Sequence, residues 1–219
     1  MIKKKLRAVL FGPQGCGKGT QGQLLAERFD VPFIGTGDMF RAEIEERTHM
    51  GKMLHEYVMN GLLAPDDLVH AVVTQRLKKL DLARGFILDG YPRNVEQATQ
   101  LDRLVKINLA IYLRISDAEA IRRLVGRRQC VRCRATYHVT DAPPVKSGIC
   151  SVCGGKLAPR EDDYEEAIQK RLATFHFMTE PLASFYRQRG VLLMVNGEQS
   201  IPYVFEELTR KMAKLGFSS

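Results

Sequence analysis

The chain has 219 residues, of which 45% are hydrophobic and 26% are charged. This balance excludes a mainly disordered, collagen-like or fibrous chain, and the length allows one large domain or two small ones. Lysine and arginine number 33 against 25 aspartate and glutamate residues, a formal net charge of +8. That excess favours an anionic partner, which is nucleic acid, a membrane surface or a phosphorylated small molecule, and a solvated basic surface without a partner fits it equally well.

The first residues combine basic and apolar side chains, as a secretory signal does. The apolar stretch from Ala8 to Phe11 runs directly into Gly12 and Pro13, so it is too short for a signal peptide. No apolar run reaches the roughly 18 residues that a membrane helix needs. We therefore expect a cytoplasmic protein with no membrane association. In that reducing compartment, the five cysteines indicate metal binding or catalysis more than disulfides.

Short apolar segments alternate with longer amphipathic ones along the chain. The pattern predicts strands at residues 6–11, 32–34, 85–88, 109–115 and 191–195. It predicts helices at residues 20–29, 65–77, 117–125, 163–189 and 201–215. Because strands and helices alternate, we expect an α/β fold with a five-stranded parallel sheet flanked by helices.

Two segments interrupt this alternation. Residues 35–64 look helical but bring no strand, and residues 127–163 lose periodicity and collect cysteine, glycine, proline and arginine. We interpret both segments as insertions into one core, which is made of residues 1–34, 65–126 and 164–219.

A glycine-rich segment at residues 12–20, GPQGCGKGT, follows the first expected strand and leads into the first expected helix. It matches the phosphate-binding pattern G-x-x-x-x-G-K, although Gly19 replaces the usual serine or threonine and Thr20 comes one residue later. Glycines let consecutive backbone N–H groups face an anion, and Lys18 adds charge for the β- and γ-phosphates. A solvated lysine beside a glycine-rich turn is the alternative, but the context favours phosphate. Cys16 is expected to fill space, not to act as a nucleophile.

Three further motifs narrow the class of nucleotide enzyme. Thr36-Gly-Asp-Met-Phe-Arg41 follows the second expected strand, Asp89-Gly-Tyr-Pro-Arg93 with Gln97 follows the third, and Arg123-Leu-Val-Gly-Arg127 leads into the cysteine segment. The Asn-Lys-x-Asp motif with which GTPases read their base is absent from the sequence. Together with the phosphate loop, these motifs make residues 6–215 resemble the adenylate kinase family, in its bacterial long form with a zinc-binding lid.

The resemblance implies a P-loop kinase fold and the reversible transfer ATP + AMP ⇌ 2 ADP, with Mg²⁺ carried on ATP. It implies a monomer whose partners are these nucleotides, not nucleic acid or a membrane. The implied ATP site consists of Gly15, Cys16, Gly17, Lys18, Gly19, Thr20, Arg123, Arg127, Thr136, Tyr137 and Gln199. The implied AMP site consists of Thr36, Arg41, Leu62, Leu63, Ala64, Gly90, Tyr91, Pro92, Arg93, Gln97, Arg160 and Arg171. The implied catalytic residues are Lys18, Asp89, Arg93, Arg123, Arg127, Arg160 and Arg171.

The resemblance assigns residues 35–64 to a nucleoside-monophosphate-binding insertion and residues 127–163 to a lid, which close over the substrates. The chemistry agrees, because phosphoryl transfer needs aligned reactants, excluded water and neutralised phosphate oxygens, and arginine binds phosphate in a bidentate way. Two residues depart from the family pattern. Gln14 stands where most members have proline, and Asn196 stands where aspartate is commoner. Neither departure removes a charged catalytic group.

Four of the cysteines have the spacing of a zinc ribbon. Two residues separate Cys130 from Cys133 and Cys150 from Cys153, and sixteen residues lie between the pairs. Four thiolates at this spacing suit a closed, structural Zn²⁺ site. His138 lies between the pairs as a possible substitute ligand, iron is an alternative metal, and a disulfide framework is the alternative without metal.

Three other functions compete with this interpretation. The first is a kinase for UMP, CMP or GMP. The resemblance argues against it, because Thr36 matches a family residue that favours AMP. The second is a nucleic-acid-binding zinc-ribbon protein with a P-loop, against which the ribbon lacks aromatic residues beyond Tyr137. The third is an assembly factor that binds ATP without transferring its phosphate. The AMP-site motifs argue against it, because such a factor needs no second nucleotide site.

Overall fold

A five-stranded parallel sheet lies at the centre of the computed structural model, which describes residues 4–59, 64–78, 84–160 and 162–218. The strands are β1 (Arg7–Phe11), β2 (Phe33–Gly35), β3 (Phe86–Asp89), β4 (Leu109–Arg114) and β8 (Leu192–Asn196). Their order is β2-β3-β1-β4-β8, and each neighbouring pair is parallel. The expected sheet is therefore confirmed.

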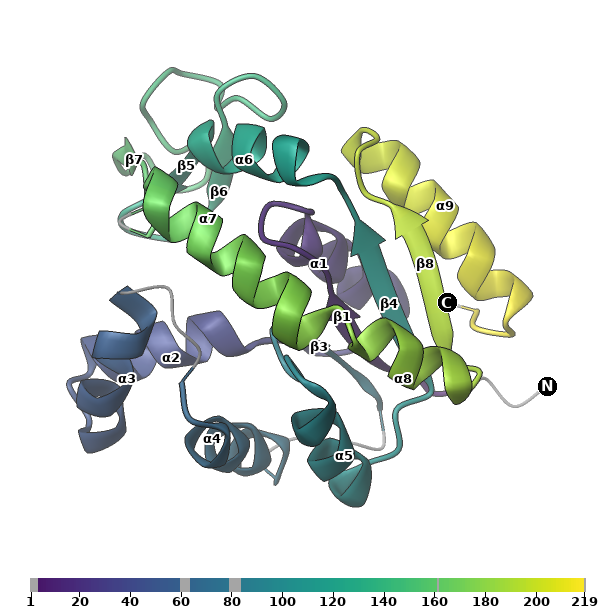
Figure 1. The fold of residues 1–219 in the computed structure, drawn as a ribbon. Helices are drawn as coiled ribbons and strands as arrows, with labels where there is room; N and C mark the ends of the chain where they lie inside the picture. Colours follow the sequence, from purple (N-terminus) through teal and green to yellow (C-terminus); the bar gives the residue numbers. More distant parts are fainter. Residues whose placement is uncertain (1–3, 60–63, 79–83, 161, 219) are drawn as a thin grey trace.

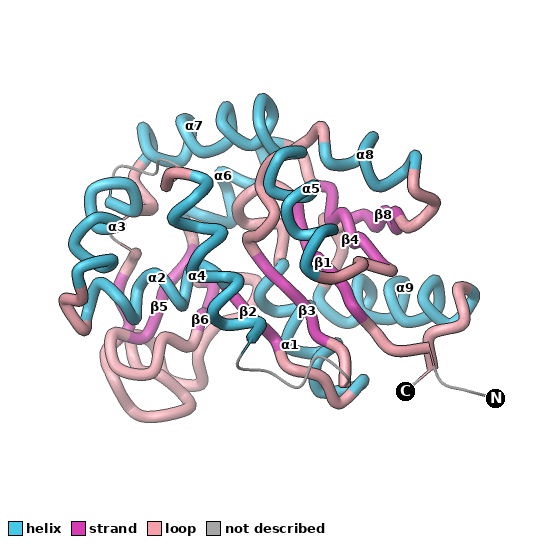
Figure 2. The backbone as a smooth tube through the Cα atoms, turned by 90° about the horizontal axis from the view of Figure 1, so that it is seen from below, coloured by secondary structure: helices cyan, strands magenta, loops and turns pink. Residues whose placement is uncertain are grey.

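Helices cover both faces of this sheet, so each strand is buried on two sides (Figure 2). On one face lie α1 (Lys18–Phe29) and α9 (Ile201–Lys214), and on the other lie α4 (Asp66–Lys78), α5 (Val95–Leu104) and α8 (Leu182–Gln188). The residues of β1 alternate between the two faces. Leu10 packs with Leu25 and Leu208, whereas Val9 packs with the core on the opposite face.

The register of the sheet brings the ends of three strands to one edge. Asp89 at the end of β3 pairs with Leu10 of β1 and with Gly35 of β2. Because the strands are parallel, the segments that follow β1, β2 and β3 all leave from this edge. Ligands of open α/β sheets bind outside this carboxyl edge, which is where the motif residues gather.

The segment 163–189, expected as one helix, is divided in the structure. It forms α7 (Glu165–Thr174), a π-helical turn at Phe175–Thr179 and then α8. The backbone N–H of Glu180 donates to the carbonyl of Phe175, five residues earlier, and Pro181 has no N–H to donate. The prediction of a continuous helix was wrong, because Pro181 and this widened turn interrupt it.

Two parts of the chain stand away from the sheet (Figure 1). Between β2 and α4 lie α2 (Thr36–Glu45) and α3 (His49–Met59). After α6 (Asp117–Val125) comes a small antiparallel sheet of β5 (Arg127–Cys130), β6 (Thr136–His138) and β7 (Leu157–Ala158), in the order β6-β5-β7. Among the described helices, each is too short or too polar to cross a membrane.

Candidate active site

The glycine-rich loop joins β1 to α1 and closes tightly on itself. Gly15 and Gly17 have φ angles of 83° and 95°, which glycine adopts without steric cost. A Cβ atom on Gly15 would lie 3.1 Å from the carbonyl oxygen of Ala120, so glycine also lets this loop approach α6 closely. The helix α1 begins directly at Lys18, which places its positive end behind the loop.

The side chains of Lys18 and Cys16 contact each other in this loop, with 3.5 Å between Nζ and Sγ. The Lys18 ammonium folds back and donates to the carbonyl oxygens of Gly12 and Pro13, at 2.8 and 2.9 Å. Cys16 is 2% exposed and packs into the apolar cluster of β1. Burial raises the pKa of its thiol, although the nearby Lys18 charge acts in the opposite direction. This environment suits a space-filling side chain and not a nucleophile.

Thr36 and Arg93 meet next to the end of β3. Thr36 is fully buried at the start of α2, and its hydroxyl donates to the carbonyl of Asp89 at 3.2 Å. The Nε atom of Arg93 donates to the carbonyl of Gly90 at 2.8 Å. Gly90 has a φ of 80°, and a Cβ atom there would collide with the Thr36 hydroxyl. Glycine at this position therefore lets the two predicted AMP-site motifs touch.

Burial and three neighbouring charged side chains change the pKa of Arg93. Burial lowers the pKa of Arg93, the Asp89 carboxylate opposes that shift, and the charges of Arg171 and Arg41 add to it. The three arginines predicted for the AMP site therefore lie close enough to repel one another. A bound anion would relieve this repulsion.

Three predicted catalytic arginines converge on two adjacent aspartates. Arg127 donates through Nε and Nη2 to both carboxylate oxygens of Asp163, at 2.6 and 2.5 Å. Arg160 makes the same two-bonded contact with Asp162, at 2.9 and 2.8 Å. Arg171 donates to the Asp162 backbone carbonyl at 2.8 Å and to the Asp163 carboxylate at 3.2 Å. The five side chains together carry one net positive charge.

Sequence reasoning missed the role of these two aspartates. Their closeness to Arg160 in the chain, with only Glu161 between, was the available signal. The Asp163 side chain is 1% exposed. Burial opposes the ionisation of Asp162, but the charges of Arg160 and Arg171 outweigh it and hold its pKa below the usual range.

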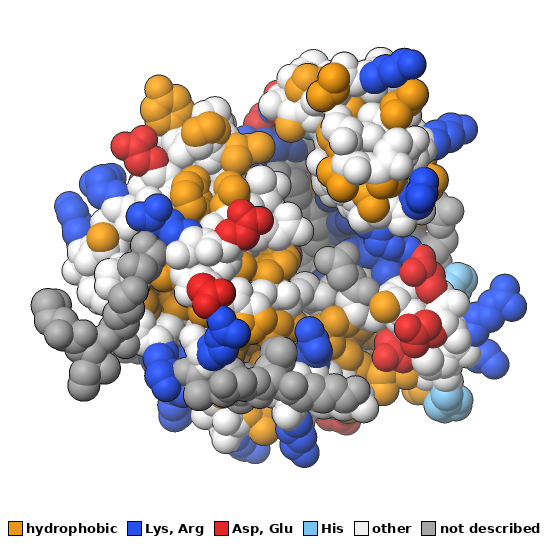
Figure 3. Space-filling model, turned by 180° about the vertical axis from the view of Figure 1, so that it is seen from behind, with side chains coloured by type: hydrophobic (Ala, Val, Ile, Leu, Met, Phe, Trp, Pro, Cys, Tyr) orange, Lys and Arg blue, Asp and Glu red, His pale blue; other side chains and the backbone are white. Residues whose placement is uncertain are grey.

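Arg123 lies beside the phosphate loop. Its Nη1 atom is 3.4 Å from the carbonyl oxygen of Gly15, and its Nε atom donates to Glu119 at 2.6 Å. Hydrogen bonds from Arg122 and then from Arg123 lower the pKa of Glu119 to about 2. Seen from behind, the molecule is hollowed between the lobe of residues 127–163 and the lobe of α2 and α3, and basic side chains show in that hollow (Figure 3).

Comparison with known proteins agrees with this geometry. The family model described as adenylate kinase matches residues 10–191. The adenylate kinase of Thermoanaerobacter sp. (strain X514) is 43% identical over 216 residues, which cover 96% of this chain and all of that protein. Those of Caldicellulosiruptor bescii and Clostridioides difficile are each 41% identical, over 94% and 93% of this chain and 99% and 96% of their own lengths. The chain belongs to the adenylate kinase family. It is a nucleotide kinase, a phosphotransferase with a P-loop kinase fold.

Four further residues implied by the adenylate kinase resemblance lie apart from the arginine clusters or outside the described residues. Leu62 and Leu63 lie outside the described residues, whereas Ala64 is described and buried. Gln199 is exposed and contacts Glu207 at 3.4 Å, but its loop adjoins the phosphate loop, because a Cβ atom on Gly197 would lie 3.1 Å from the carbonyl of Cys16.

The two implied lid contacts, Thr136 and Tyr137, lie on β6 and differ in surroundings. Thr136 is exposed. The Tyr137 hydroxyl accepts from the backbone N–H of Ser151 at 2.9 Å and lies 3.4 Å from the sulfur of Cys150. Tyr137 is partly buried and packs against the cysteine cluster.

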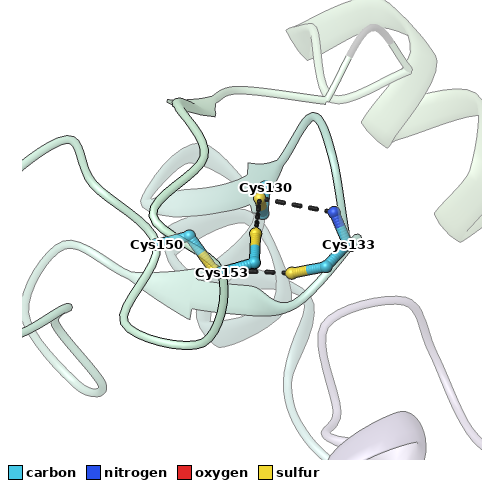
Figure 4. A group of neighbouring side chains, drawn as sticks. All are labelled: Cys130, Cys133, Cys150 and Cys153. Carbon is cyan, nitrogen blue, oxygen red and sulfur yellow. Dashed lines mark hydrogen bonds between the residues drawn. The ribbon is translucent and has the colours of Figure 1, made fainter.

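The four cysteines of residues 130–153 point toward a common centre (Figure 4). Their sulfur atoms all lie within 4.8 Å of one another, and the pairs Cys130–Cys153 and Cys133–Cys150 are each 3.5 Å apart. All five cysteines of the chain are free thiols in this structure. The group could therefore hold a metal ion, and tetrahedral sulfur ligation suits zinc or iron.

Backbone groups around the cluster favour thiolate sulfur. The N–H groups of Arg132 and Cys133 point at Cys130, with nitrogen–sulfur distances of 3.4 and 3.5 Å. His138 is turned away, because its Nδ1 atom accepts from the backbone N–H of Asp141 at 3.0 Å. Among the described residues, His138 is not part of the metal-binding group.

Proposed function

We infer that this adenylate kinase performs ATP + AMP ⇌ 2 ADP with the basic side chains gathered at the carboxyl edge of its sheet. The observation that carries this assignment is the convergence of Arg127, Arg160 and Arg171 on one pair of aspartates. Such a cluster is poised to exchange carboxylate partners for phosphate oxygens, which arginine binds with the same two-bonded geometry.

The ATP phosphates would lie over the loop of residues 12–20. The backbone N–H groups of that loop and the start of α1 would bind the β-phosphate. The Lys18 ammonium, now bonded to loop carbonyls, would swing to the phosphate oxygens. Arg123, which already reaches the Gly15 carbonyl, would neutralise the same group from α6.

The AMP phosphate would lie on the other side, against Arg93 and Arg41. Arg93 donates to the Gly90 carbonyl, and Gly90 adjoins Thr36, so the guanidinium lies near the start of α2. Arg160 and Arg171 would bind the transferring phosphoryl between the two nucleotides. The attacking phosphate oxygen is already anionic, so alignment and charge neutralisation suffice without a strong base.

We propose Mg²⁺ as the companion of ATP, with Asp89 as the protein group nearest to it. A carboxylate is the hard oxygen donor that Mg²⁺ prefers, and Asp89 ends β3 directly beside β1 and the phosphate loop. When bound, the ion would neutralise negative charge on the ATP phosphates.

We propose that residues 35–64 close over AMP and that residues 127–163 close over ATP, so that water is excluded during transfer. We also propose that the cysteine group holds a structural Zn²⁺. Among its described residues, the lid has a small buried cluster around Cys130, Cys150 and Leu157, so a metal would supply stability that this core lacks. We further propose that the protein is cytoplasmic. We also propose that it is a monomer, because residues from one chain supply both phosphate sites.

A coupled assay tests the proposed reaction. The purified protein should form ADP from ATP and AMP, and do so much more slowly with UMP, CMP or GMP. ADP formation only with another monophosphate would identify a different nucleoside monophosphate kinase, and none with any would overturn the assignment. Elemental analysis of the same sample should find about one zinc per chain, and size-exclusion chromatography should give the monomer.

A further inference from the structure

The backbone of Arg93 is fixed at both of its ends. Its N–H donates to the side-chain oxygen of Gln97 at 2.7 Å. Its carbonyl accepts from the hydroxyl of Thr179 at 2.7 Å. The Gln97 carboxamide is therefore one of two side chains that hold the Arg93 backbone.

The Gln97 carboxamide has one orientation that satisfies its neighbours. Gln97 is 1% exposed, so its polar atoms need partners within the protein. Its oxygen accepts from the Arg93 N–H, which leaves its nitrogen to face the Asp66 carboxylate at 2.6 Å. A flipped carboxamide would turn its nitrogen to another donor and its oxygen to another acceptor.

Asp66 binds a second amide in the same way. The side-chain nitrogen of Asn94 donates to the other carboxylate oxygen of Asp66 at 2.8 Å. The side-chain oxygen of Asn94 then accepts from the backbone N–H of Gln97 at 2.7 Å and caps the first turn of α5. Asp66, Asn94 and Gln97 thus form a closed set of hydrogen bonds between the starts of α4 and α5. While residue 94 is asparagine, only a side chain at residue 66 that accepts through both of its terminal atoms completes the set.

We propose that Asp66 is a positioning residue for AMP binding, which sets the direction of Arg93 through Gln97 and Asn94. The proposal rests on the proposed function, in which Arg93 binds the AMP phosphate. Asp66 is the first residue of α4 and follows the segment 35–64, which we assign to AMP, after Pro65. It therefore joins that segment to the Arg93 loop. The same bonds commit the Gln97 oxygen to the Arg93 backbone.

A swap of the two side chains separates positioning from the general effect of an acid at a helix start. In Asp66→Asn, one amide nitrogen must face another amide nitrogen. In Asn94→Asp, two carboxylates face each other. The double variant Asp66→Asn/Asn94→Asp restores every hydrogen bond with the carboxylate moved to residue 94, where aspartate caps a helix as well as asparagine does. Asp67→Asn is the matched control, because Asp67 is exposed in the same helical turn and carries the same charge.

The experiment measures kcat, the KM for AMP and the KM for ATP in each variant, with AMP binding followed separately by calorimetry. Loss of a buried hydrogen bond to a charged group corresponds to about a tenfold or larger change in affinity. We expect Asp66→Asn and Asn94→Asp each to raise the KM and the Kd for AMP about tenfold. The KM for ATP should stay within about twofold, the double variant should return close to the wild type, and Asp67→Asn should match it.

Three results would overturn the proposal. They are an Asp66→Asn variant that behaves like Asp67→Asn, a double variant that remains as impaired as the single ones, and equal changes in the KM values for AMP and ATP. If a single variant does not fold, the double variant decides, because it retains all the bonds. Arg93→Ala is measured alongside: if it binds AMP normally, the proposed function of Arg93 fails, whatever the swap shows.

Discussion

Arg127 and Asp163 form a two-bonded ion pair in which the carboxylate is almost completely buried. The two nitrogen–oxygen distances are 2.6 and 2.5 Å, and the Asp163 side chain is 1% exposed. Arg171 contacts the same carboxylate at 3.2 Å. Two proposed phosphate-binding arginines are therefore held in place by an acid that a nucleotide must displace or share.

The first prediction concerns Asp163→Asn. Removing one charge from a buried pair leaves its partner uncompensated, so we expect the free energy of unfolding to fall by about 3 kcal/mol. Urea denaturation measures this loss. ATP should raise the Tm of the variant by more than that of the wild type, because phosphate then competes with Asp162 alone and no longer with Asp163. Equal shifts would contradict the exchange of carboxylate for phosphate, and the exposed Glu166→Gln is the control.

The second prediction concerns Lys18→Met. The ammonium of Lys18 bonds only to loop carbonyls and to the Cys16 sulfur in the described structure, so the fold should survive its loss. Turnover should fall about a thousandfold, as when a preorganised charge is removed from a reaction centre. Steady-state assays and circular dichroism check both parts. Near-normal turnover would refute the role of Lys18, and Lys214→Met on the exposed end of α9 should have no effect.

The third prediction concerns the pH dependence of stability at His176. Its ring nitrogens contact Glu180 and Asp117, each at 2.9 Å, and these hydrogen bonds raise the pKa of His176. A raised pKa means that the charged form stabilises the fold. This contribution is complete below the unfolded pKa of about 6.5 and is lost as the pH rises through the higher folded value.

The wild type should therefore exceed His176→Gln in stability at pH 5.5 by a few tenths of a kcal/mol, because the pair is partly exposed and screened. The difference should shrink toward pH 9, as urea denaturation at several pH values will show. A difference that grows with pH would have the wrong sign for this contact.

The core of the fold could be predicted because its strands are buried on both faces and read as short apolar runs. Other elements could not be predicted from local patterns. The apolar pattern did not predict helix α5, because the helix packs against the core through a narrow apolar stripe at Ala98 and Leu101. The strands β5, β6 and β7 were missed because cysteine sulfurs replace much of the apolar core in that region.

Within the site, the basic residues were predictable from motifs, whereas their acidic partners were not. Asp163 and Asp66 act through contacts with Arg127 and Gln97, which lie 36 and 31 residues away in the chain. Such distant pairs leave no spacing signal in one sequence. The same holds for Thr179, which lies in the π-helical turn and whose hydroxyl donates to the Arg93 carbonyl 86 residues away.

The fourth prediction concerns Cys133→Ser. Loss of one of four sulfur ligands should weaken metal binding and lower the Tm, while turnover at low temperature is retained because no phosphate contact changes. Differential scanning fluorimetry and the coupled assay test this together. A chelator should lower the Tm of the wild type but not that of the variant. Complete loss of turnover with a folded lid would contradict a purely structural site.

The fifth prediction concerns Tyr137→Phe. The Tyr137 hydroxyl accepts from the Ser151 N–H, so its own proton points to the Cys150 sulfur at 3.4 Å. A metal-bound thiolate carries no proton, so the tyrosine is the donor in that pair. Loss of a hydrogen bond to a metal ligand typically weakens metal binding by about 10- to 100-fold.

Competition with a chromogenic chelator measures the affinity of the Tyr137→Phe variant for zinc. The control is Tyr203→Phe, because Tyr203 is exposed on α9, far along the chain from the cysteines. Zinc affinity should fall only in the first variant, with a lower Tm that excess zinc restores. If both variants bind zinc as the wild type does, the hydroxyl contributes nothing to the cluster, and Tyr137 serves the lid through its ring alone.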